Sequence, residues 1–350
     1  MAQQRHESEG FIRVEKKDSK PNVEICFPDG YPVVVVFPGQ GSQFPGMGKD
    51  LIQDKETSKA YKEADRITTL PIGDVSYDEG VYLEDPLFSR LSVFVRNNAI
   101  LEEFKKDPLF NPKILGGRDV GFFNALVAAG AISDEDGLIL VQAEAEAMSH
   151  IAQNVIALSI EKDSGFSGRD IKEELRQLKE NGLHLKAVDS EKRLVVGGFR
   201  FSHHRSDSVI KDLKDKGFTV STLPGRGASH TSLMEPIVEK IEEVLKHVSI
   251  KDADVEVIAN STGLPIKTKE EIREEILRQI TRPILWTSVV KYLENRQIYR
   301  IFEVGAQRVV IDPMTNNKWK DVCIGACTLE GKDSKVLGLY LNREEDLLAA

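Results

Sequence analysis

The sequence predicts an α/β protein in which helices cover a mostly parallel sheet and a smaller subdomain is inserted. Three stretches support this prediction. Residues 33–37, Val-Val-Val-Val-Phe, are apolar throughout, as a central parallel strand is. Residues 115–130 have the form of a strand, a tight glycine-lined turn and a helix. Residues 153–226 alternate strand and helix patterns in the order βαββαβ.

These patterns predict the division of the chain. Residues 1–31 are expected to form a flexible N-terminal extension, because residues 1–20 are polar and charged. Residues 32–152 and 227–350 are expected to form the large α/β subdomain, and residues 153–226 the small one. The order βαββαβ is that of a ferredoxin-like subdomain.

The individual elements follow from hydrophobic periodicity and turn residues. After the first strand, residues 38–43 form a loop that can expose backbone N–H groups, and mostly helical structure follows up to residue 115. Further helices are expected at 132–148, 170–181, 206–216, 232–247, 269–279 and 287–295. Further strands are expected at 155–160, 183–188, 194–198, 218–223, 255–259 and 298–304, with a strand and surface loops over 322–341.

Composition excludes several classes of protein. The formal net charge of −9 argues against nucleic acid as the main partner. No apolar run reaches the ~18 residues of a membrane helix, and the N-terminus lacks the apolar core of a signal peptide, so we expect a cytoplasmic protein with no membrane association. The three cysteines do not form a metal-binding framework, and no metal site is predicted. The composition does not indicate an oligomeric state.

The turn within residues 115–130 has a recognisable form. Gly117 and Gly121 flank Arg118, Asp119 and Val120 in the pattern Gly-x-Asp-x-Gly, which is the form of a nucleophile elbow. Glycines suit such a turn because a Cβ would clash where the backbone is crowded. The elbow residue is normally Ser, whereas here it is Asp119. The alternative is an ordinary strand-to-helix turn in which Asp119 caps the helix.

Several motifs resemble those of the malonyl-CoA:acyl-carrier-protein transacylase family, which includes the acyltransferase domains of polyketide and fatty-acid synthases. Residues 37–43, Phe-Pro-Gly-Gln-Gly-Ser-Gln, and residues 46–48, Gly-Met-Gly, match its opening motif. Later matches follow in order at 125–130, 228–236, 260–263, 278–286 and 302–305. The resemblance implies an α/β-hydrolase-like large subdomain with a ferredoxin-like insert. It also implies a substrate carried on phosphopantetheine, by an acyl carrier protein or CoA, and no bound cofactor.

The resemblance also assigns roles to single residues. In this family a Ser attacks the acyl thioester, a His takes its proton and backbone N–H groups hold the oxyanion. The matching N–H groups here are those of Gln40 and Val120, and the matching histidine is His230. Gln279 matches the residue whose carbonyl orients that histidine, and Asn260 belongs to the same pocket.

Four pocket positions depart from the family pattern. Asp119 stands in place of the nucleophilic Ser, and Arg118 in place of the His before it. Glu144 stands where an Arg would bind the malonyl carboxylate, and Arg90 where a Gln is usual. At ~4 Å and an effective dielectric of ~20, Glu144 would repel a malonyl carboxylate by about 4 kcal/mol. Ordinary malonyl transfer is therefore not expected.

Three hypotheses remain for the function. Asp119 and His230 could serve as an acid–base pair for proton abstraction, dehydration, isomerisation or decarboxylation of an acyl thioester. Asp119 could instead be a nucleophile, which leads to hydrolysis. The chain could also be an inactive homologue that binds a carrier protein or a polyketide synthase.

The charges of the site can also be anticipated. We expect Asp119 to be ionised at the start of its helix, with help from Arg118 if that side chain points inward. We expect His230 to hold its proton more readily beside Asp119. A cleft between the subdomains should contain both residues together with Arg90, Arg118 and Glu144.

Overall fold

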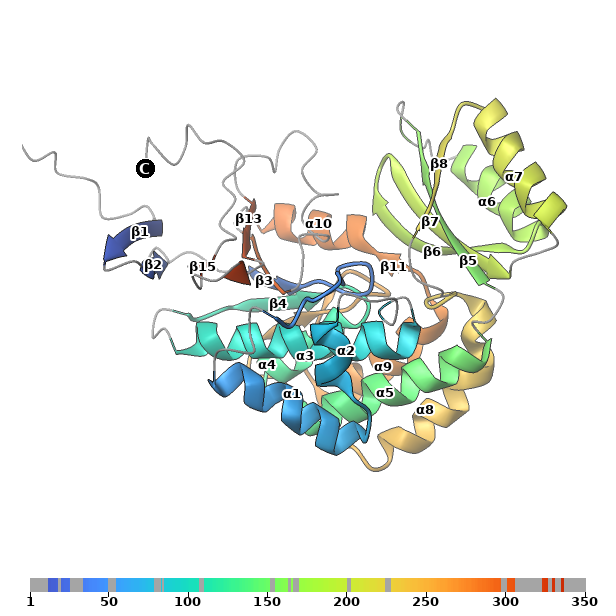
Figure 1. Cartoon of the computed structure of the whole chain (residues 1–350). Coiled ribbons are helices and arrows are strands. Elements are labelled where there is room, and N and C mark those ends of the chain that lie inside the picture. The colour runs from blue at the N-terminus through green and yellow to red at the C-terminus, as the bar shows by residue number, and fades with distance from the viewer. Residues whose placement is uncertain are drawn as a thin grey trace, which may run out of the picture.

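The computed structural model describes most of the chain between residues 34 and 305. The described residues are 12–17, 20–25, 34–49, 55–78, 83, 85–106, 110–151, 155–162, 165, 170–199, 203–223, 228–296, 301–305, 323–326, 329–330 and 335–336. Two sheets organise these residues, one among the helices of the large subdomain and one beside it (Figure 1).

The larger sheet has six strands in the order β10-β9-β4-β3-β12-β13. All neighbours are parallel except β10, which pairs with β9 antiparallel. The strands are β3 (Val34–Phe37), β4 (Ile114–Gly117), β9 (Glu256–Ile258), β10 (Pro265–Ile266), β12 (Ile301–Val304) and β13 (Cys323–Ala326). The apolar run therefore forms a central strand, as predicted, because both of its faces are covered.

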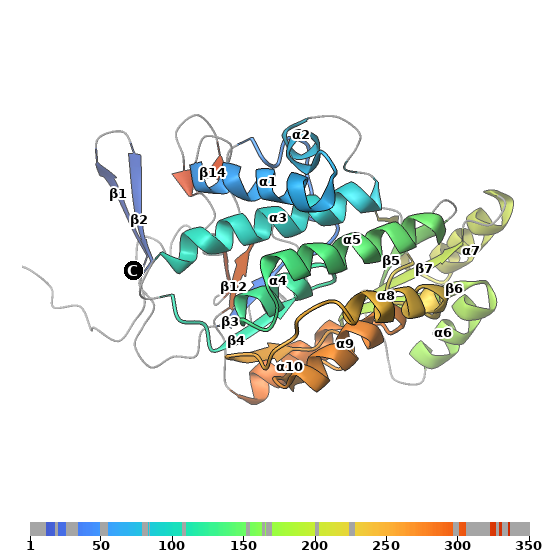
Figure 2. The ribbon, with the colours of Figure 1, turned by 90° about the horizontal axis from the view of Figure 1, so that it is seen from below.

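Helices cover both faces of this sheet, as the two views show (Figures 1 and 2). Val35 and Phe37 pack into the core beneath most of the helices, whereas Val34 and Val36 pack on the other side with Trp286. This alternation is the period of two of a strand. The helices are α1 (Lys55–Thr68), α2 (Ile72–Tyr77), α3 (Pro86–Lys105), α4 (Gly121–Ala128), α5 (Asp134–Ile151), α8 (Val238–Leu245), α9 (Lys269–Thr281) and α10 (Trp286–Asn295).

The second sheet belongs to the inserted segment. Its antiparallel strands have the order β6-β7-β5-β8, which is the ferredoxin-like order for βαββαβ. The elements are β5 (Val155–Glu161), α6 (Asp170–Glu180), β6 (Leu183–Ser190), β7 (Arg193–Phe199), α7 (His203–Asp215) and β8 (Thr219–Thr222). A short strand from the large subdomain, β11 (Ile284–Leu285), pairs with β6 and joins the two parts.

The predicted fold class is confirmed, with two local differences. The predicted helix at 232–247 begins as a 3-10 helix (η3, Ser232–Ile237) and becomes α8 only at Val238, because Pro236 has no N–H for an α-helical bond. Part of the expected flexible extension instead forms a hairpin of β1 (Ile12–Lys17) and β2 (Lys20–Ile25).

The rest of the predicted extension and most residues after 305 lie outside the described part of the chain. The described residues after 305 form β13, β14 (Leu329–Glu330) and β15 (Lys335–Val336). None of the helices among the described residues combines the length and the apolarity that crossing a membrane requires.

The end of β4 offers a test of how tightly the elbow is packed. A Cβ on Gly117 would lie 1.9 Å from the carbonyl oxygen of Gly121, whereas one on Gly116 would meet Val36 at an ordinary 3.5 Å. We expect Gly117→Ala to lower the free energy of unfolding by about 3 kcal/mol or more, and Gly116→Ala to change it by about 1 kcal/mol or less. Urea unfolding measures both, and equal losses would contradict the packing described.

Candidate active site

Asp119 sits on a sharp backbone turn between β4 and α4. Its φ of 56° lies in the left-handed region, where Asp is tolerated better than most residues. The turn packs against the loop after β3, since a Cβ on Gly39 would lie 2.1 Å from the carbonyl oxygen of Arg118. The Arg118 N–H also donates to the Phe37 carbonyl at 3.0 Å. This is the geometry of a nucleophile elbow.

The alternative interpretation, in which Asp119 caps α4, is wrong. The residue at the cap position is Val120, and no side chain there bonds the helix N–H groups. Only the backbone carbonyl of Asp119 serves the helix, by accepting the Phe122 N–H at 3.0 Å. The Asp119 side chain is instead buried, and it is available for contacts with other side chains.

The Asp119 carboxylate belongs to a buried ion cluster. Arg90 on α3 donates from Nη1 to Asp119 Oδ1 at 2.5 Å and from Nη2 to Glu144 Oε2 on α5 at 2.7 Å. The Arg90 side chain is 1% exposed and the two carboxylates are 6% exposed. One guanidinium is therefore shared by two carboxylates out of contact with water.

His230 completes the cluster. Its Nε2 lies 3.0 Å from Asp119 Oδ1, and its Nδ1 lies 2.7 Å from the Gln279 carbonyl oxygen. Asn260 in turn donates to Gln279 Oε1 at 3.0 Å. Gln279 therefore contacts the ring directly, and Asn260 positions Gln279. His230 also has a positive φ of 62°. Left-handed backbone at a non-glycine residue costs free energy and is typical of functional positions.

Two N–H groups near the elbow remain available. Within the part of the chain that the structure describes, the backbone N–H groups of Gln40 and Val120 have no hydrogen-bond partner. The Gln40 side chain turns away and donates to Ser89 Oγ at 3.3 Å. Paired free N–H groups at an elbow are the donors that an oxyanion hole requires. The prediction that they serve so remains a prediction.

The charge of Asp119 agrees with expectation but has a different cause. Burial raises its pKa, but Arg90 and then His230 outweigh that effect and hold the pKa well below its ordinary value. Arg118, the expected contributor to this charge, pairs with another carboxylate. Its Nη2 donates to Asp189 Oδ1 on β6 at 2.7 Å. Asp119 is therefore an anion because of Arg90.

The expected effect on His230 is wrong in its net direction. Asp119 does favour the protonated ring, but burial is the larger effect and lowers the His230 pKa. The geometry nevertheless requires a proton in this contact. Both ring nitrogens face oxygen atoms, and neither the Gln279 carbonyl nor an ionised Asp119 can donate. Hydrogen bonds at both nitrogens therefore require a protonated ring, whereas burial favours the neutral one.

Two contacts from the small subdomain were not predicted. Lys186 on β6 donates to Ser229 Oγ, next to His230, at 2.6 Å. Burial lowers the Lys186 pKa to about 8, although Asp119 opposes the shift. Together with the Arg118–Asp189 pair, this contact connects β6 to the elbow turn and to the loop that carries His230. The sequence signal for Lys186 was only its place in a strand predicted to border the cleft.

A small cavity lies beside the ion cluster, and Arg90, Glu144 and His230 line it. The centre of a water molecule has about 10 Å³ there, which is room for one water. The expected cleft that contains all five residues stays a prediction.

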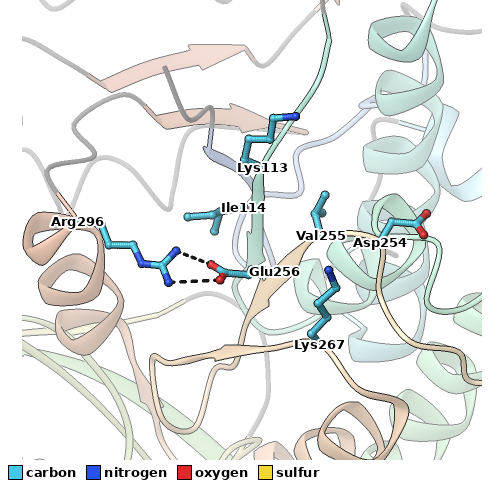
Figure 3. Close-up of a pocket in the computed structure, with 7 residues that line it drawn as sticks. All are labelled: Lys113, Ile114, Asp254, Val255, Glu256, Lys267 and Arg296. Atoms are coloured by element: carbon cyan, nitrogen blue, oxygen red, sulfur yellow. Dashed lines mark hydrogen bonds and ion pairs between the residues drawn. The ribbon is translucent and has the colours of Figure 1, made fainter. Parts of the chain in front are cut away.

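A larger hollow of about 480 Å³ lies elsewhere (Figure 3). It borders Ile114 and Glu256, at the amino ends of β4 and β9, whereas Asp119 follows the carboxyl end of β4. Arg296 closes one side of it by pairing with Glu256 at 2.7 Å. Ligands of open α/β sheets bind outside the carboxyl ends of the strands, so this hollow is not the candidate site. No group of three or more His, Cys, Asp or Glu side chains among the described residues could hold a metal ion.

Fold and site together define an acyltransferase-type α/β protein with a carboxylate at its elbow. The chain matches the acyl transferase domain family over residues 34–302, and it belongs to that family. It is 27% identical over 285 residues to the malonyl CoA-acyl carrier protein transacylase of Bacillus subtilis (strain 168), covering 79% of this chain and 88% of that protein. It is 27% identical over 307 residues to the mitochondrial malonyl-CoA-acyl carrier protein transacylase of Homo sapiens, covering 82% and 78%.

Solved structures share the fold. The crystal structure of FabD from Acinetobacter baumannii superposes with a TM-score of 0.77 at 23% identity, covering 91% of this chain and 97% of that one. A malonyl-transacylase in complex with its type II PKS acyl-carrier protein superposes with a TM-score of 0.76 at 20% identity, covering 85% and 96%.

The ion cluster predicts a specific pH dependence of stability. Burial raises the Glu144 pKa from 4.5 to about 7, with Arg90 opposing the shift. A carboxyl whose pKa is raised in the folded state adds to the free energy of unfolding below pH ~4.5, its unfolded pKa. For Glu144 this contribution is about 3 kcal/mol, and it is lost as the pH rises towards ~7. We expect Glu144→Gln to match the wild type at pH ~4.5 and to exceed its free energy of unfolding at pH ~7.5.

Urea unfolding at several pH values measures this difference. Glu146→Gln, a partly exposed carboxylate on the same helix, is the control and should show no such dependence. A wild-type-minus-variant difference for Glu144→Gln that stays constant from pH ~4.5 to ~7.5 would contradict the assignment.

Proposed function

We propose that this protein acts on acyl thioesters carried on the phosphopantetheine arm of an acyl carrier protein, in fatty-acid or polyketide biosynthesis. Membership of the acyl transferase domain family supports this, as do relatives named malonyl CoA-acyl carrier protein transacylase. The structural neighbour in complex with an acyl-carrier protein supports the kind of partner. In this proposal Asp119 and His230 form an acid–base pair and not a nucleophile with its base.

The observation that carries the proposal is the 3.0 Å contact between Asp119 and His230. A proton shared by a carboxylate and a buried imidazole can be moved to or from a substrate. The free N–H groups of Gln40 and Val120 would polarise the thioester carbonyl, which acidifies the neighbouring carbon. Proton abstraction, dehydration, isomerisation and decarboxylation next to a carbonyl all require these two functions.

Covalent transfer through residue 119 fits the geometry poorly. Attack by the Asp119 carboxylate on a thioester would give a mixed anhydride, which hydrolyses readily. Arg90 also donates a hydrogen bond to Asp119 Oδ1 at 2.5 Å, and this bond makes the carboxylate a weaker nucleophile. A malonyl carboxylate would meet Glu144, and the one guanidinium nearby is already shared by two protein carboxylates.

A second candidate function is that of a carrier-protein or synthase partner without chemistry. The closed cluster favours this candidate, because the cavity beside Arg90 and Glu144 has room for only one water. Catalysis would require these side chains to move when substrate binds.

The deciding experiment uses candidate acyl carrier proteins loaded with defined acyl groups. The protein should change the acyl group, which mass spectrometry detects for dehydration, decarboxylation or hydrolysis and NMR detects for isomerisation. Asp119→Asn and His230→Ala should lower the rate by at least about a hundredfold, the usual range for an acid–base group.

Two exposed residues of the same types provide matched controls. Asp215→Asn and His247→Ala should leave the rate within about twofold, because both side chains lie on the surface. Binding of the carrier protein without any change of the acyl group would favour the partner function. Full activity in both Asp119→Asn and His230→Ala would contradict the acid–base proposal.

Malonyl transfer provides a separate prediction. The wild type should acquire no malonyl group from malonyl-CoA, and neither should Asp119→Ser, because Glu144 still neutralises Arg90. The triple variant Asp119→Ser, Arg90→Gln, Glu144→Arg restores three residues of the family pattern and should load malonyl. Intact-protein mass spectrometry detects the adduct. Malonyl loading by Asp119→Ser alone would show that Glu144 does not exclude the substrate.

A further inference from the structure

The small cavity beside the ion cluster has an unusual wall. Arg90 and Glu144 form one side of it, with His230 next to them. The remaining lining is mostly apolar, from side chains of α5, η3 and α9: Met148, Met234, Ile237 and Ile280. The cavity is therefore an apolar pocket with one charged wall, of a size that admits a single water or a group of that size.

Each of the two charged residues keeps one unused atom. Arg90 uses both Nη atoms on carboxylates, and its Nε has no partner among the described residues. Glu144 uses Oε2 on Arg90, and its Oε1 has no partner. Both atoms are buried, and leaving a charged group's hydrogen bond unmade in such a place is costly. The wall thus offers one donor and one acceptor.

The chemistry of this wall selects the group that can fill it. When Glu144 is ionised, a carboxylate cannot donate to it, an ammonium cannot accept from Arg90, and a methyl group satisfies neither. A hydroxyl both accepts and donates. It also suits either state of Glu144, because it can accept a hydrogen bond from the acid or donate one to the anion.

We propose that the Arg90–Glu144 cavity is a specificity site for a hydroxyl group, filled by water in the free protein and by the hydroxyl of an acyl chain in the complex. This inference rests on the proposed function and names its substrate class, hydroxyacyl thioesters. The hydroxyl accepts from Arg90 Nε and interacts with Glu144 Oε1.

The test measures binding of acyl-pantetheine probes in which an amide replaces the thioester, so that no probe is consumed. The panel is butyryl-pantetheine and its 2-, 3- and 4-hydroxy forms, with malonyl-pantetheine. At least one hydroxy probe should bind the full-length protein about ten- to a hundredfold more tightly than the butyryl probe. Glu144→Leu should remove this preference, whereas Glu146→Leu on the outer side of α5 should keep it.

A crystal structure of the free protein provides a second measurement that needs no variant. It should show one water in contact with Arg90 Nε and Glu144 Oε1, and an empty cavity would overturn the inference. Equal binding of butyryl and hydroxybutyryl probes, or a preference that survives Glu144→Leu in a folded variant, would also overturn it. In those cases the butyryl probe still binds, and the proposed function stands. Binding of no acyl probe at all would overturn both.

Discussion

One guanidinium serves two buried carboxylates, and the rest of the site depends on this constraint. Arg90 reaches Asp119 at the elbow and Glu144 on α5, so it fixes α3, α5 and the end of β4 relative to one another. It lowers the pKa of Asp119, whereas burial raises the pKa of Glu144 although Arg90 opposes that shift. The small cavity follows too, because the paired side chains fill the space that a substrate carboxylate would need.

The cluster also limits which chemistry the elbow can perform. A carboxylate held at 2.5 Å by a guanidinium is a weak nucleophile, and its other neighbour, at 3.0 Å, is an imidazole that can carry a proton. Asp119 and His230 both have left-handed backbone. Such backbone lowers the stability of the fold and is typical of functional positions.

The fold could be predicted from the sequence more fully than the site. The apolar run of β3 and the βαββαβ order are local patterns, and motifs placed Asp119 near His230 across 111 residues. The pairing of Arg90 with Glu144 could not be predicted, because each lies on a long helix and only the packing of α3 on α5 brings them together. The lowered His230 pKa arises from burial, and the choice of Asp189 by Arg118 arises from the position of β6. Neither leaves a pattern in the chain.

The charged side chains around the elbow depend on one another. Arg90 pairs with Asp119 and Glu144, and Asp189 pairs with Arg118 at 2.7 Å and lies 3.6 Å from Arg193. Removing one partner of a buried ion pair leaves an uncompensated charge and costs about 3–5 kcal/mol. These side chains therefore stabilise one another as a set, and the buried cation Arg90 already meets two of the protein's own carboxylates.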